Sequence, residues 1–318
     1  MEIIAILFSS LGVTALFADN RKESKSYLKQ GMRKWISQDN TGAIQDLSKA
    51  IELNPKYAEA YCNRGIVKCF LQDYTGAGLD LSKAVELNPK YAAAYCNRGI
   101  VNYFLQDNTG AIQDLSKAIE LSPKYAKAYC GRGLAKIKLQ DYTGAIQDLS
   151  KAIELNPKYA AAYCNQGIVK CFLRDNTEAI QDLSKAIELN PKYAEAYCNR
   201  GIVKYFLQDN TGAIQDLSKA IELNPKYTEA YCNQGIVKYF LRDYTGAIQD
   251  LSKAIELDPK YAWAYYGRGQ VKFDLQDYTG AVQDYSKAVE LNPNPKYTLA
   301  YYGRGRTKEI LNDKRGAL

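Results

Sequence analysis

The segment TGAIQDLSKAIELNPKY occupies residues 41–57 and recurs without change at residues 143–159 and 211–227. These copies are separated by multiples of 34 residues, and the same interval separates tyrosines, glycines and prolines along most of the 318 residues. A fixed period of this length indicates an array in which each unit stacks on its neighbours. Complete units run over residues 24–57, 58–91, 92–125, 126–159, 160–193, 194–227, 228–261 and 262–297, and residues 298–318 begin a ninth.

The second half of each unit predicts an amphipathic helix. In unit 92–125 its start is marked by Asp107-Asn108-Thr109, whose side chains can accept hydrogen bonds from free backbone N–H groups. The Ser-Pro or Asn-Pro pair at its end forces the residue before proline out of helical geometry. The apolar residues fall at i, i+1, i+4, i+7 and i+8 on one stripe, and they are Ala111, Ile112, Leu115, Ala118 and Ile119.

The first half of each unit predicts a helix that is apolar on more than one side, over residues 94–105 in the same unit. Such a helix must bury two faces, or bury one and offer the other to a partner.

This 34-residue pattern resembles the tetratricopeptide repeat (TPR) over residues 24–318. The resemblance rests on Tyr61-x2-Arg64-Gly65-x2-Lys68, followed by Ala77-x3-Leu81, Ala84 and Pro89, and on its eight tandem copies. It implies an all-α fold, a right-handed superhelical solenoid of helix–turn–helix repeats. Two residues depart from the family pattern: arginine or glutamine stands at position 7 of the unit in place of leucine, and lysine at position 11 in place of tyrosine. We expect Arg64 to lay its stem on apolar surface and to keep its guanidinium in water.

Two Gly-x-Gly pairs, in residues 131–133 and 303–305, resemble the start of a phosphate-binding loop. They follow no strand and no GxxxxGK motif is present, so we expect them inside helices. The glycine at position 8 is instead expected to let the two helices of a unit approach closely.

The TPR resemblance implies that the first helices line a concave groove through positions 2, 5, 6, 9, 12 and 13. Cysteine at position 5 is then expected to be a small apolar groove residue. The predicted groove residues at the other positions are Asn63, Asn97, Asn165, Asn199, Asn233, Ile66, Ile100, Ile168, Ile202, Ile236, Phe70, Phe104, Phe172, Phe206, Phe240, Tyr103, Tyr205 and Tyr239.

An apolar and aromatic surface of this extent is typical of a partner site. The asparagine amides both donate and accept, so a ladder of them could hold an extended peptide backbone; alternatively they cap turns or face solvent. Near-identical repeats favour a long ligand of low specificity or a scaffolding role. The alternative is that function is confined to a few divergent units, at Gly131, Lys136, Lys138, Trp263, Tyr266 and Gln270.

Composition excludes several kinds of site. The chain has no histidine, which removes every Ser-His, Cys-His and His-metal arrangement. Its eight cysteines form no CxxC pair, and most lie one repeat apart, beyond the roughly 7 Å limit for a disulfide. We therefore expect no metal site, no cofactor and no catalytic residue.

The net charge of +7 resides mainly in units 24–57 and 126–159 and in residues 298–318, while most other units are neutral. A nucleic-acid-binding array should carry a continuous basic stripe. Nucleic acid is therefore not expected as a partner.

The apolar stretch at residues 3–18 is short for a membrane-spanning helix but suits the core of a secretory signal. It predicts export to a periplasmic or other extracytoplasmic location, or N-terminal anchoring, with membrane contact only through residues 3–18 if they are uncleaved. The alternative is a cytoplasmic protein in which this stretch packs on the first repeat. Residues 1–23 are thus expected to form this segment and a short linker, and residues 298–318 a capping helix.

The sequence predicts a non-catalytic scaffold for protein–protein interaction, which binds an extended or helical peptide segment in its groove. The identity of the protein or peptide partner is left open. The first alternative is the substrate-recruiting arm of a larger enzyme or complex, and the second is an RNA-binding helical array.

Overall fold

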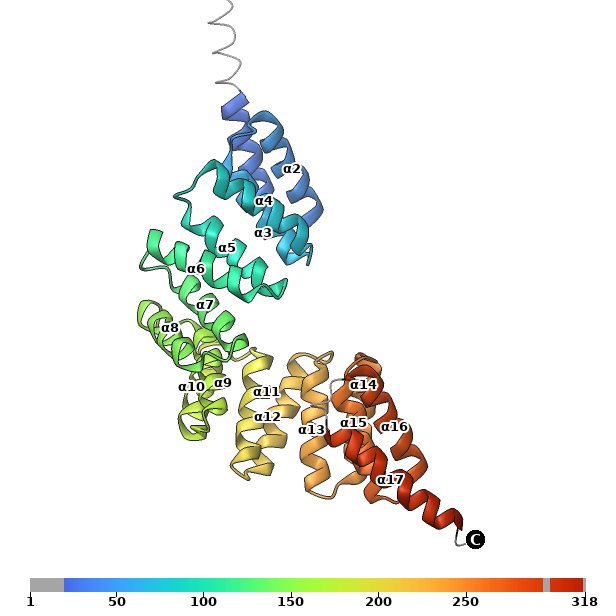
Figure 1. The fold of residues 1–318 in the computed structure, drawn as a ribbon. Coiled ribbons are helices and arrows are strands. Elements are labelled where there is room, and N and C mark those ends of the chain that lie inside the picture. The colour runs from blue at the N-terminus through green and yellow to red at the C-terminus, as the bar shows by residue number, and fades with distance from the viewer. Residues whose placement is uncertain (1–19, 294–297, 317–318) are drawn as a thin grey trace, which may run out of the picture. The chain divides into compact units, whose positions relative to one another are not determined.

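A computed structural model describes residues 20–293 and 298–316, and within these residues the chain forms helices and no strand (Figure 1). The chain divides into two compact halves, Met1–Pro157 and Lys158–Leu318. The predicted leader or anchor, residues 3–18, and Asn294 and Pro295 lie outside the described residues. Residues 20–23 were expected to belong to a linker, but they are helical. They form the start of the first described helix, which covers residues 20–36.

Every repeat unit contains a first and a second helix, as predicted. In the N-terminal half the helix over residues 20–36 is followed by α2 (Asn40–Leu53), α3 (Ala58–Phe70), α4 (Tyr74–Leu87), α5 (Ala92–Phe104), α6 (Asn108–Leu121), α7 (Ala126–Lys138) and α8 (Tyr142–Leu155). In the C-terminal half the helices are α9 (Ala160–Phe172), α10 (Asn176–Leu189), α11 (Ala194–Phe206), α12 (Asn210–Leu223), α13 (Thr228–Phe240), α14 (Tyr244–Leu257), α15 (Ala262–Asp274), α16 (Tyr278–Leu291) and α17 (Thr298–Gly316).

An aspartate starts the second helix of each unit. The carboxylate of Asp107 accepts a hydrogen bond from the backbone N–H of Gly110 at 2.9 Å, which confirms the predicted start of α6. This bond satisfies one of the four N–H groups that a helix N-terminus leaves free. The equivalent caps are Asp39, Asp73, Asp141, Asp175, Asp209, Asp243 and Asp277.

The turn before this cap contains a left-handed residue. In unit 58–91 it is Gln72, whose φ is 64°. The N–H of Gln72 donates to the carbonyl of Cys69, and the N–H of Asp73 donates to the carbonyl of Lys68. This pair of bonds is a Schellman motif, in which glycine is the usual left-handed residue. Here glutamine or arginine holds the same place in all eight turns, at Gln38, Gln72, Gln106, Gln140, Arg174, Gln208, Arg242 and Gln276.

The glycine at position 8 allows the two helices of a unit to touch, as predicted. A Cβ atom added to Gly99 in α5 would lie 2.7 Å from Leu115 Cγ and 3.1 Å from the carbonyl oxygen of Ala111, both in α6. Distances this short are below ordinary van der Waals contact, so only glycine fits without movement of its neighbours. The two Gly-x-Gly pairs also lie within helices, α7 and α17, as expected.

The cysteines at position 5 are buried, so the prediction that they belong to the groove surface is wrong. Their exposed fractions are 3% or less, and each belongs to a core cluster or lies beside one. The reason is that successive first helices contact one another directly, and position 5 falls within that contact. These cysteines are Cys62, Cys96, Cys130, Cys164, Cys198 and Cys232.

Direct contacts between first helices define an inner side in each half. In the N-terminal half α3 contacts α5, and α5 contacts α7; in the C-terminal half α9, α11, α13 and α15 form a similar series. Among the described residues, second helices contact first helices but make no comparable contacts with each other. The first helices therefore stand closer together than the second helices, and they form what we call the inner face of each half. At the C-terminal end α17 packs on α16 and α15.

Candidate functional site: the inner face of the first helices

Phenylalanine at position 13 gives the inner face a row of exposed apolar side chains. This phenylalanine is the last residue of α3, α5, α9, α11 and α13. The exposed fractions of Phe70, Phe104, Phe172, Phe206 and Phe240 range from 49% to 68%, although burying a phenylalanine normally stabilises a fold by about 2–3 kcal/mol. These side chains are therefore exposed on the inner face, as the predicted groove requires. The row is interrupted by Lys138 in unit 126–159 and by Asp274 in unit 262–297.

The predicted isoleucines and tyrosines lie deeper than the phenylalanines. Ile66, Ile100, Ile168, Ile202 and Ile236 are partly buried and pack against the core clusters. Tyr103, Tyr205 and Tyr239 are also partly buried. Tyr103 and Tyr239 each meet the phenylalanine that follows them edge to face, with ring centroids 5.6 Å and 5.1 Å apart. The isoleucines and tyrosines thus form the floor from which the phenylalanine rings project.

The predicted asparagine residues differ in exposure. Asn97 and Asn165 are buried, with exposed fractions of 8% and 5%, whereas Asn63, Asn199 and Asn233 are partly exposed. The side-chain N–H of Asn97 lies 3.8 Å from the Cys62 sulfur of the preceding unit. Its carbonyl oxygen accepts from the Lys127 ammonium at 3.0 Å. Asn199 and Asn233 donate to Cys164 and Cys198 in the same way, so part of each amide already serves the contact between units.

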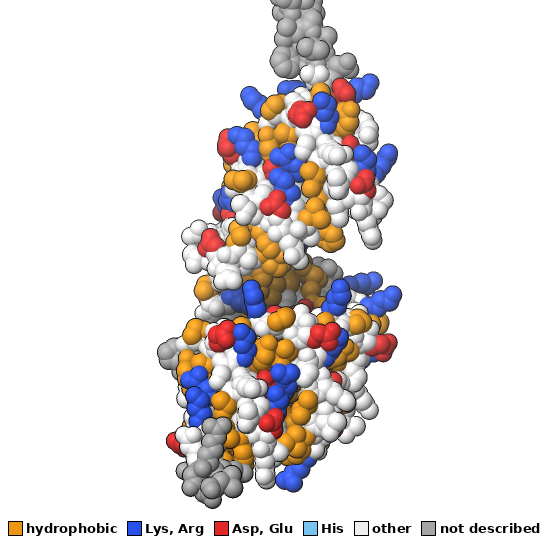
Figure 2. All heavy atoms as spheres, turned by 90° about the vertical axis from the view of Figure 1, so that its right-hand side faces the viewer, with side chains coloured by type: hydrophobic (Ala, Val, Ile, Leu, Met, Phe, Trp, Pro, Cys, Tyr) orange, Lys and Arg blue, Asp and Glu red, His pale blue; other side chains and the backbone are white. Residues whose placement is uncertain are grey.

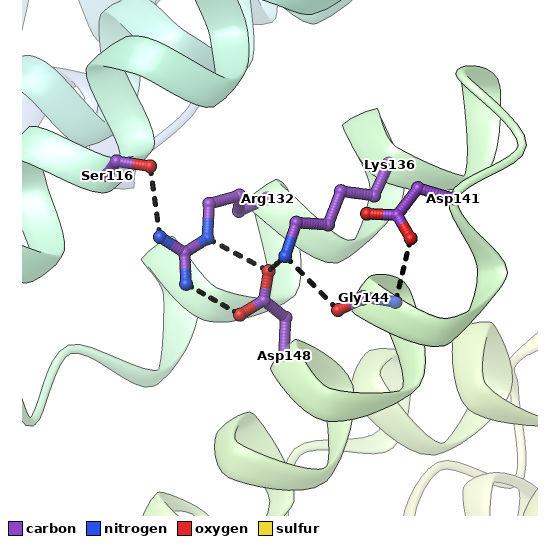
Figure 3. Close-up of polar contacts among 6 residues, drawn as sticks. All are labelled: Ser116, Arg132, Lys136, Asp141, Gly144 and Asp148. Atoms are coloured by element: carbon purple, nitrogen blue, oxygen red, sulfur yellow. Dashed lines mark hydrogen bonds and ion pairs between the residues drawn. The ribbon is translucent and has the colours of Figure 1, made fainter.

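A repeated ion-pair network is built from positions 7 and 11, the two positions at which the sequence departs from the TPR pattern. In unit 126–159 Arg132 donates through Nε and Nη2 to both oxygens of Asp148, at 2.9 and 2.7 Å (Figure 3). Lys136 lies 2.8 Å from the same carboxylate. The remaining Nη1 donates to the hydroxyl of Ser116 in the preceding unit at 2.9 Å.

The same network shows that the expected position of the Arg64 guanidinium in water is wrong. Arg64 binds both oxygens of Asp80 at 2.9 and 2.7 Å, and its side chain is 19% exposed. Asp80 is almost fully buried, and a buried carboxylate needs a paired and hydrogen-bonded cation. The guanidinium also lies 5.7 Å from the ring centroid of Tyr61. Arg98, Arg132, Arg200 and Arg268 repeat this arrangement.

Three units carry glutamine in place of this arginine, as Gln30, Gln166 and Gln234, and the aspartate of each unit lacks the two arginine bonds. Asp182 and Asp250 each pair with one lysine, Lys170 at 2.8 Å and Lys238 at 2.7 Å. Burial of these carboxylates disfavours the charged form and raises the pKa of both above the usual value of 3.8. Gln234 retains the bond to the preceding unit, since its amide donates to the Ser218 hydroxyl at 2.6 Å. Charge inside the array is therefore balanced mostly within each unit.

A hollow of about 630 Å³ opens on the inner face between α9, the start of α10 and α11. Its walls include Cys171, Phe172, Asn176, Asn199, Ile202 and Phe206. We call it the α9–α11 pocket. The groove positions that the sequence implies do not predict this pocket, because it depends on positions 12 and 17 of the unit together, and position 17 belongs to the second helix. A shallower hollow of about 470 Å³ in the N-terminal half lies beside Trp35, Ile36 and Phe70.

Unit 262–297 differs from the others at most of its inner-face positions. Tyr239 of the preceding unit donates to Asp274 at 2.7 Å, and Gln270 lies between Tyr239 and Tyr285, at 3.4 and 3.1 Å. Trp263 is 46% exposed and meets Tyr266 edge to face. The divergent residues in this unit thus form a polar and aromatic end to the inner face.

Basic and acidic side chains are interspersed on the face drawn in Figure 2, with apolar side chains between them. This fits the ion pairs of the interior and those of the second helices, where a lysine and a glutamate three residues apart pair in every unit. Within residues 20–293 and 298–316, no helix has the length and hydropathy that crossing a membrane requires. In the same part of the chain, no group of three or more acidic or cysteine side chains is placed to hold a metal ion.

The geometry described above is that of stacked helix–turn–helix units, and family models agree with it. A model described as TPR repeat matches residues 36–68, 103–140, 175–208 and 242–276. A model described as tetratricopeptide repeat matches residues 126–159, 194–227 and 262–295. The matches cover more than half of the chain, so the protein belongs to the TPR family. The predicted fold class, an all-α solenoid of TPR units, is confirmed.

Solved structures with the same fold have low sequence identity to this chain. A chain of the APC/C hetero-tetramer Cut9-Hcn1 aligns with a TM-score of 0.72 and 18% identity over 84% of this chain, which spans only 52% of the length of that one. A tetratricopeptide repeat protein from Parabacteroides merdae gives 0.63 and 19%, covering 79% of this chain and 99% of the other. PilF from Pseudomonas aeruginosa gives 0.58 and 18%, covering 67% and 96%. No curated protein matches the sequence.

Proposed function

We propose that this protein is a non-catalytic scaffold that binds a segment of a partner protein along the inner face of its first helices. The TPR fold is typical of proteins that bind protein or peptide partners. The observation that carries the finer proposal is the row of phenylalanines at position 13, which stay about half exposed or more in five units whose cores are otherwise closed. Covering an exposed apolar surface with a partner removes it from water, which lowers the free energy and favours binding.

The chemistry of the inner face favours an extended or helical peptide of low sequence specificity. Phenylalanine rings supply apolar contact that is similar from unit to unit. Asn63, Asn199 and Asn233 are partly exposed, and they are the asparagines whose amides can reach a peptide backbone. Asn97 and Asn165 are buried, and Asn97 supports the contact between units. The proposal therefore rests on apolar contact first and on amide contact second.

The test is a crosslinking pull-down from the native host with the full chain and a variant carrying Phe104→Asp, Phe206→Asp and Phe240→Asp. A matched control carries Leu79→Asp, because Leu79 is 70% exposed on a second helix, α4. Circular dichroism must first show that all three proteins are equally helical. We expect a set of partners that the control retains and the triple variant loses. If both variants capture the same proteins, the inner face is not the binding surface.

A further inference from the structure

The α9–α11 pocket exists because unit 160–193 lacks an aromatic ring at both position 12 and position 17. It has Cys171 and Asn176 there, whereas every other complete unit has an aromatic residue at one position or both. In unit 58–91 the ring of Tyr74 at position 17 stacks on Phe104, with centroids 4.9 Å apart. In unit 194–227 the ring of Tyr205 at position 12 lies 5.5 Å from that of Phe240. A ring from either helix thus reaches the phenylalanine of the next unit, and unit 160–193 leaves that space open.

A basic residue also lines this pocket. Arg174 lines the pocket, is exposed, and stands where six of the other seven complete units have an uncharged glutamine in a turn of the same shape. Its guanidinium makes no hydrogen bond or ion pair within the described residues. Lys170, the nearest other cation in sequence, is neutralised by Glu178 and Asp182, both at 2.8 Å. Asp175 uses a carboxylate oxygen to cap α10, at 3.2 Å from the Glu178 nitrogen.

We propose that the α9–α11 pocket accepts one bulky apolar side chain of the bound peptide, next to an acidic residue that pairs with Arg174. The proposal rests on the peptide-binding function above and deepens it. The phenylalanine and isoleucine contacts are alike in five units and cannot by themselves position a peptide along the array. One pocket that differs from the rest fixes which part of the peptide lies over α9 and α11. Its volume of about 630 Å³ lies within the range of ligand pockets, roughly 300–1,000 Å³.

Cys171 gives a direct readout of pocket occupancy. It lines the pocket and is partly exposed, and Cys69 is its counterpart at position 12 of unit 58–91 with the same degree of exposure. Tyr74 occupies the space beside Cys69. The two thiols therefore form a matched pair within one molecule, and alkylation by N-ethylmaleimide, located by mass spectrometry, measures access to each.

The probes are nine-residue Gly-Ser peptides with a central Trp-Glu, Trp-Lys or Ala-Glu pair. We expect the Trp-Glu peptide to slow alkylation of Cys171 at least fivefold and to leave Cys69 unchanged. The Trp-Lys and Ala-Glu peptides should require about tenfold higher concentrations for the same protection, because one loses the ion pair and the other the apolar burial. Decanoate is the comparison ligand. Protection by decanoate without protection by any peptide would overturn the proposal in favour of a site for acyl chains.

Variants taken from the chain's own repeats separate the pocket from the rest of the inner face. Cys171→Tyr with Asn176→Tyr reproduces the Tyr239 and Tyr244 pair, whose centroids lie 6.0 Å apart. Asn176 loses no bond at its carbonyl oxygen, which has no hydrogen-bond partner. The matched control is Asn108→Tyr, beside Tyr103 in unit 92–125.

Fluorescence anisotropy of the labelled Trp-Glu peptide reads binding to these variants. We expect the filled-pocket variant to lose at least tenfold in affinity, the control to bind normally, and Arg174→Gln to bind Trp-Glu and Trp-Lys peptides alike. Equal binding by the filled-pocket variant, or equal protection of Cys69 and Cys171, would overturn the proposal. If partners from the host are lost with the triple phenylalanine variant but kept with the filled pocket, the proposed function stands and only this inference fails.

Discussion

Gln234→Arg is expected to stabilise the C-terminal half by completing an ion-pair network that its neighbours already have. In unit 194–227 Arg200 contacts both oxygens of Asp216 at 2.8 and 2.7 Å and the Ser184 hydroxyl at 3.1 Å. Gln234 makes only the serine bond, and Asp250 is left with Lys238. Arginine at this position would add two charge-assisted bonds to a largely buried carboxylate.

The size of the gain follows from those two bonds. A hydrogen bond to a charged group contributes about 1.5–3 kcal/mol net, but Lys238 already neutralises part of the Asp250 charge and is 24% exposed. We therefore expect about 1–2 kcal/mol in the free energy of local unfolding. This corresponds to a roughly 5- to 30-fold slowing of amide hydrogen exchange in α14 at neutral pH.

The stabilisation by Gln234→Arg should also depend on pH, because it depends on the charge of Asp250. Burial raises the pKa of Asp250 above its unfolded value near 3.8, so its ionised form costs stability above the raised pKa. That cost is relieved as the pH falls through the raised pKa toward 3.8, because the folded state then takes up a proton. The advantage of the Gln234→Arg variant should be largest near pH 7 and should shrink as the pH falls through the raised pKa, because Asp250 then takes up a proton.

The assay is hydrogen exchange of the full chain at pH 7, with urea unfolding by circular dichroism at pH 7 and pH 4, because repeat arrays need not unfold in one step. The control is Arg200→Gln, which makes the reverse change one unit earlier and should lose a similar amount. An equal gain at both pH values, or no change in α14, would show that the charge on Asp250 is not what the arginine stabilises.

Three further predictions concern packing, turns and thiols. Gly201→Ala should lower the unfolding free energy by about 1–2 kcal/mol in urea titrations. The new Cβ would lie 2.9 Å from Leu217 Cγ and 3.1 Å from the Ala213 carbonyl oxygen. Unchanged stability would mean that the two helices separate at little cost. Gln72→Gly should raise it by about 0.5–1 kcal/mol, because φ is 64° at this position, and Gln72→Ala is the control that should gain nothing. Under native conditions Cys69 and Cys171 should react with maleimide before the other six thiols, which are buried. Burial raises the pKa of Cys96 to about 11 and those of Cys198 and Cys232 to about 12. Rapid labelling of Cys198 in the native protein would contradict the buried contact between first helices.

Much of the fold could be predicted because its determinants are local in sequence. The 34-residue period, the aspartate caps and the proline ends depend on residues a few positions apart, and the helix bounds agree closely with them. α5 begins at Ala92, two residues before the predicted start, since nothing in the sequence marks that end with a side-chain cap. The exposure of the phenylalanines was also predicted, from the implied face of the first helix.

The interior polar contacts could not be predicted in the same way. Arg64 was expected in water because its partner Asp80 lies sixteen residues away on another helix, and Ser48 lies sixteen residues before it in another unit. The cysteines at position 5 were assigned to the groove because single-helix periodicity does not show that two first helices meet there. The α9–α11 pocket depends on two helices of one unit and one of the next, although the joint choice of residues at positions 12 and 17 was a readable signal.

Five arginines and Gln234 at position 7 each contact a serine of the preceding unit, and this has an evolutionary consequence. Ser82 serves Arg98, Ser116 serves Arg132, and Ser218 serves Gln234. A serine hydroxyl stands at the same place in each of these junctions, and either arginine or glutamine at position 7 can donate a hydrogen bond to it. One unit can therefore follow another without a new interface. Unequal recombination within the gene could therefore add or delete whole units while leaving junctions of this kind satisfied. The near-identity of TGAIQDLSKAIELNPKY in distant units is what such a history would leave.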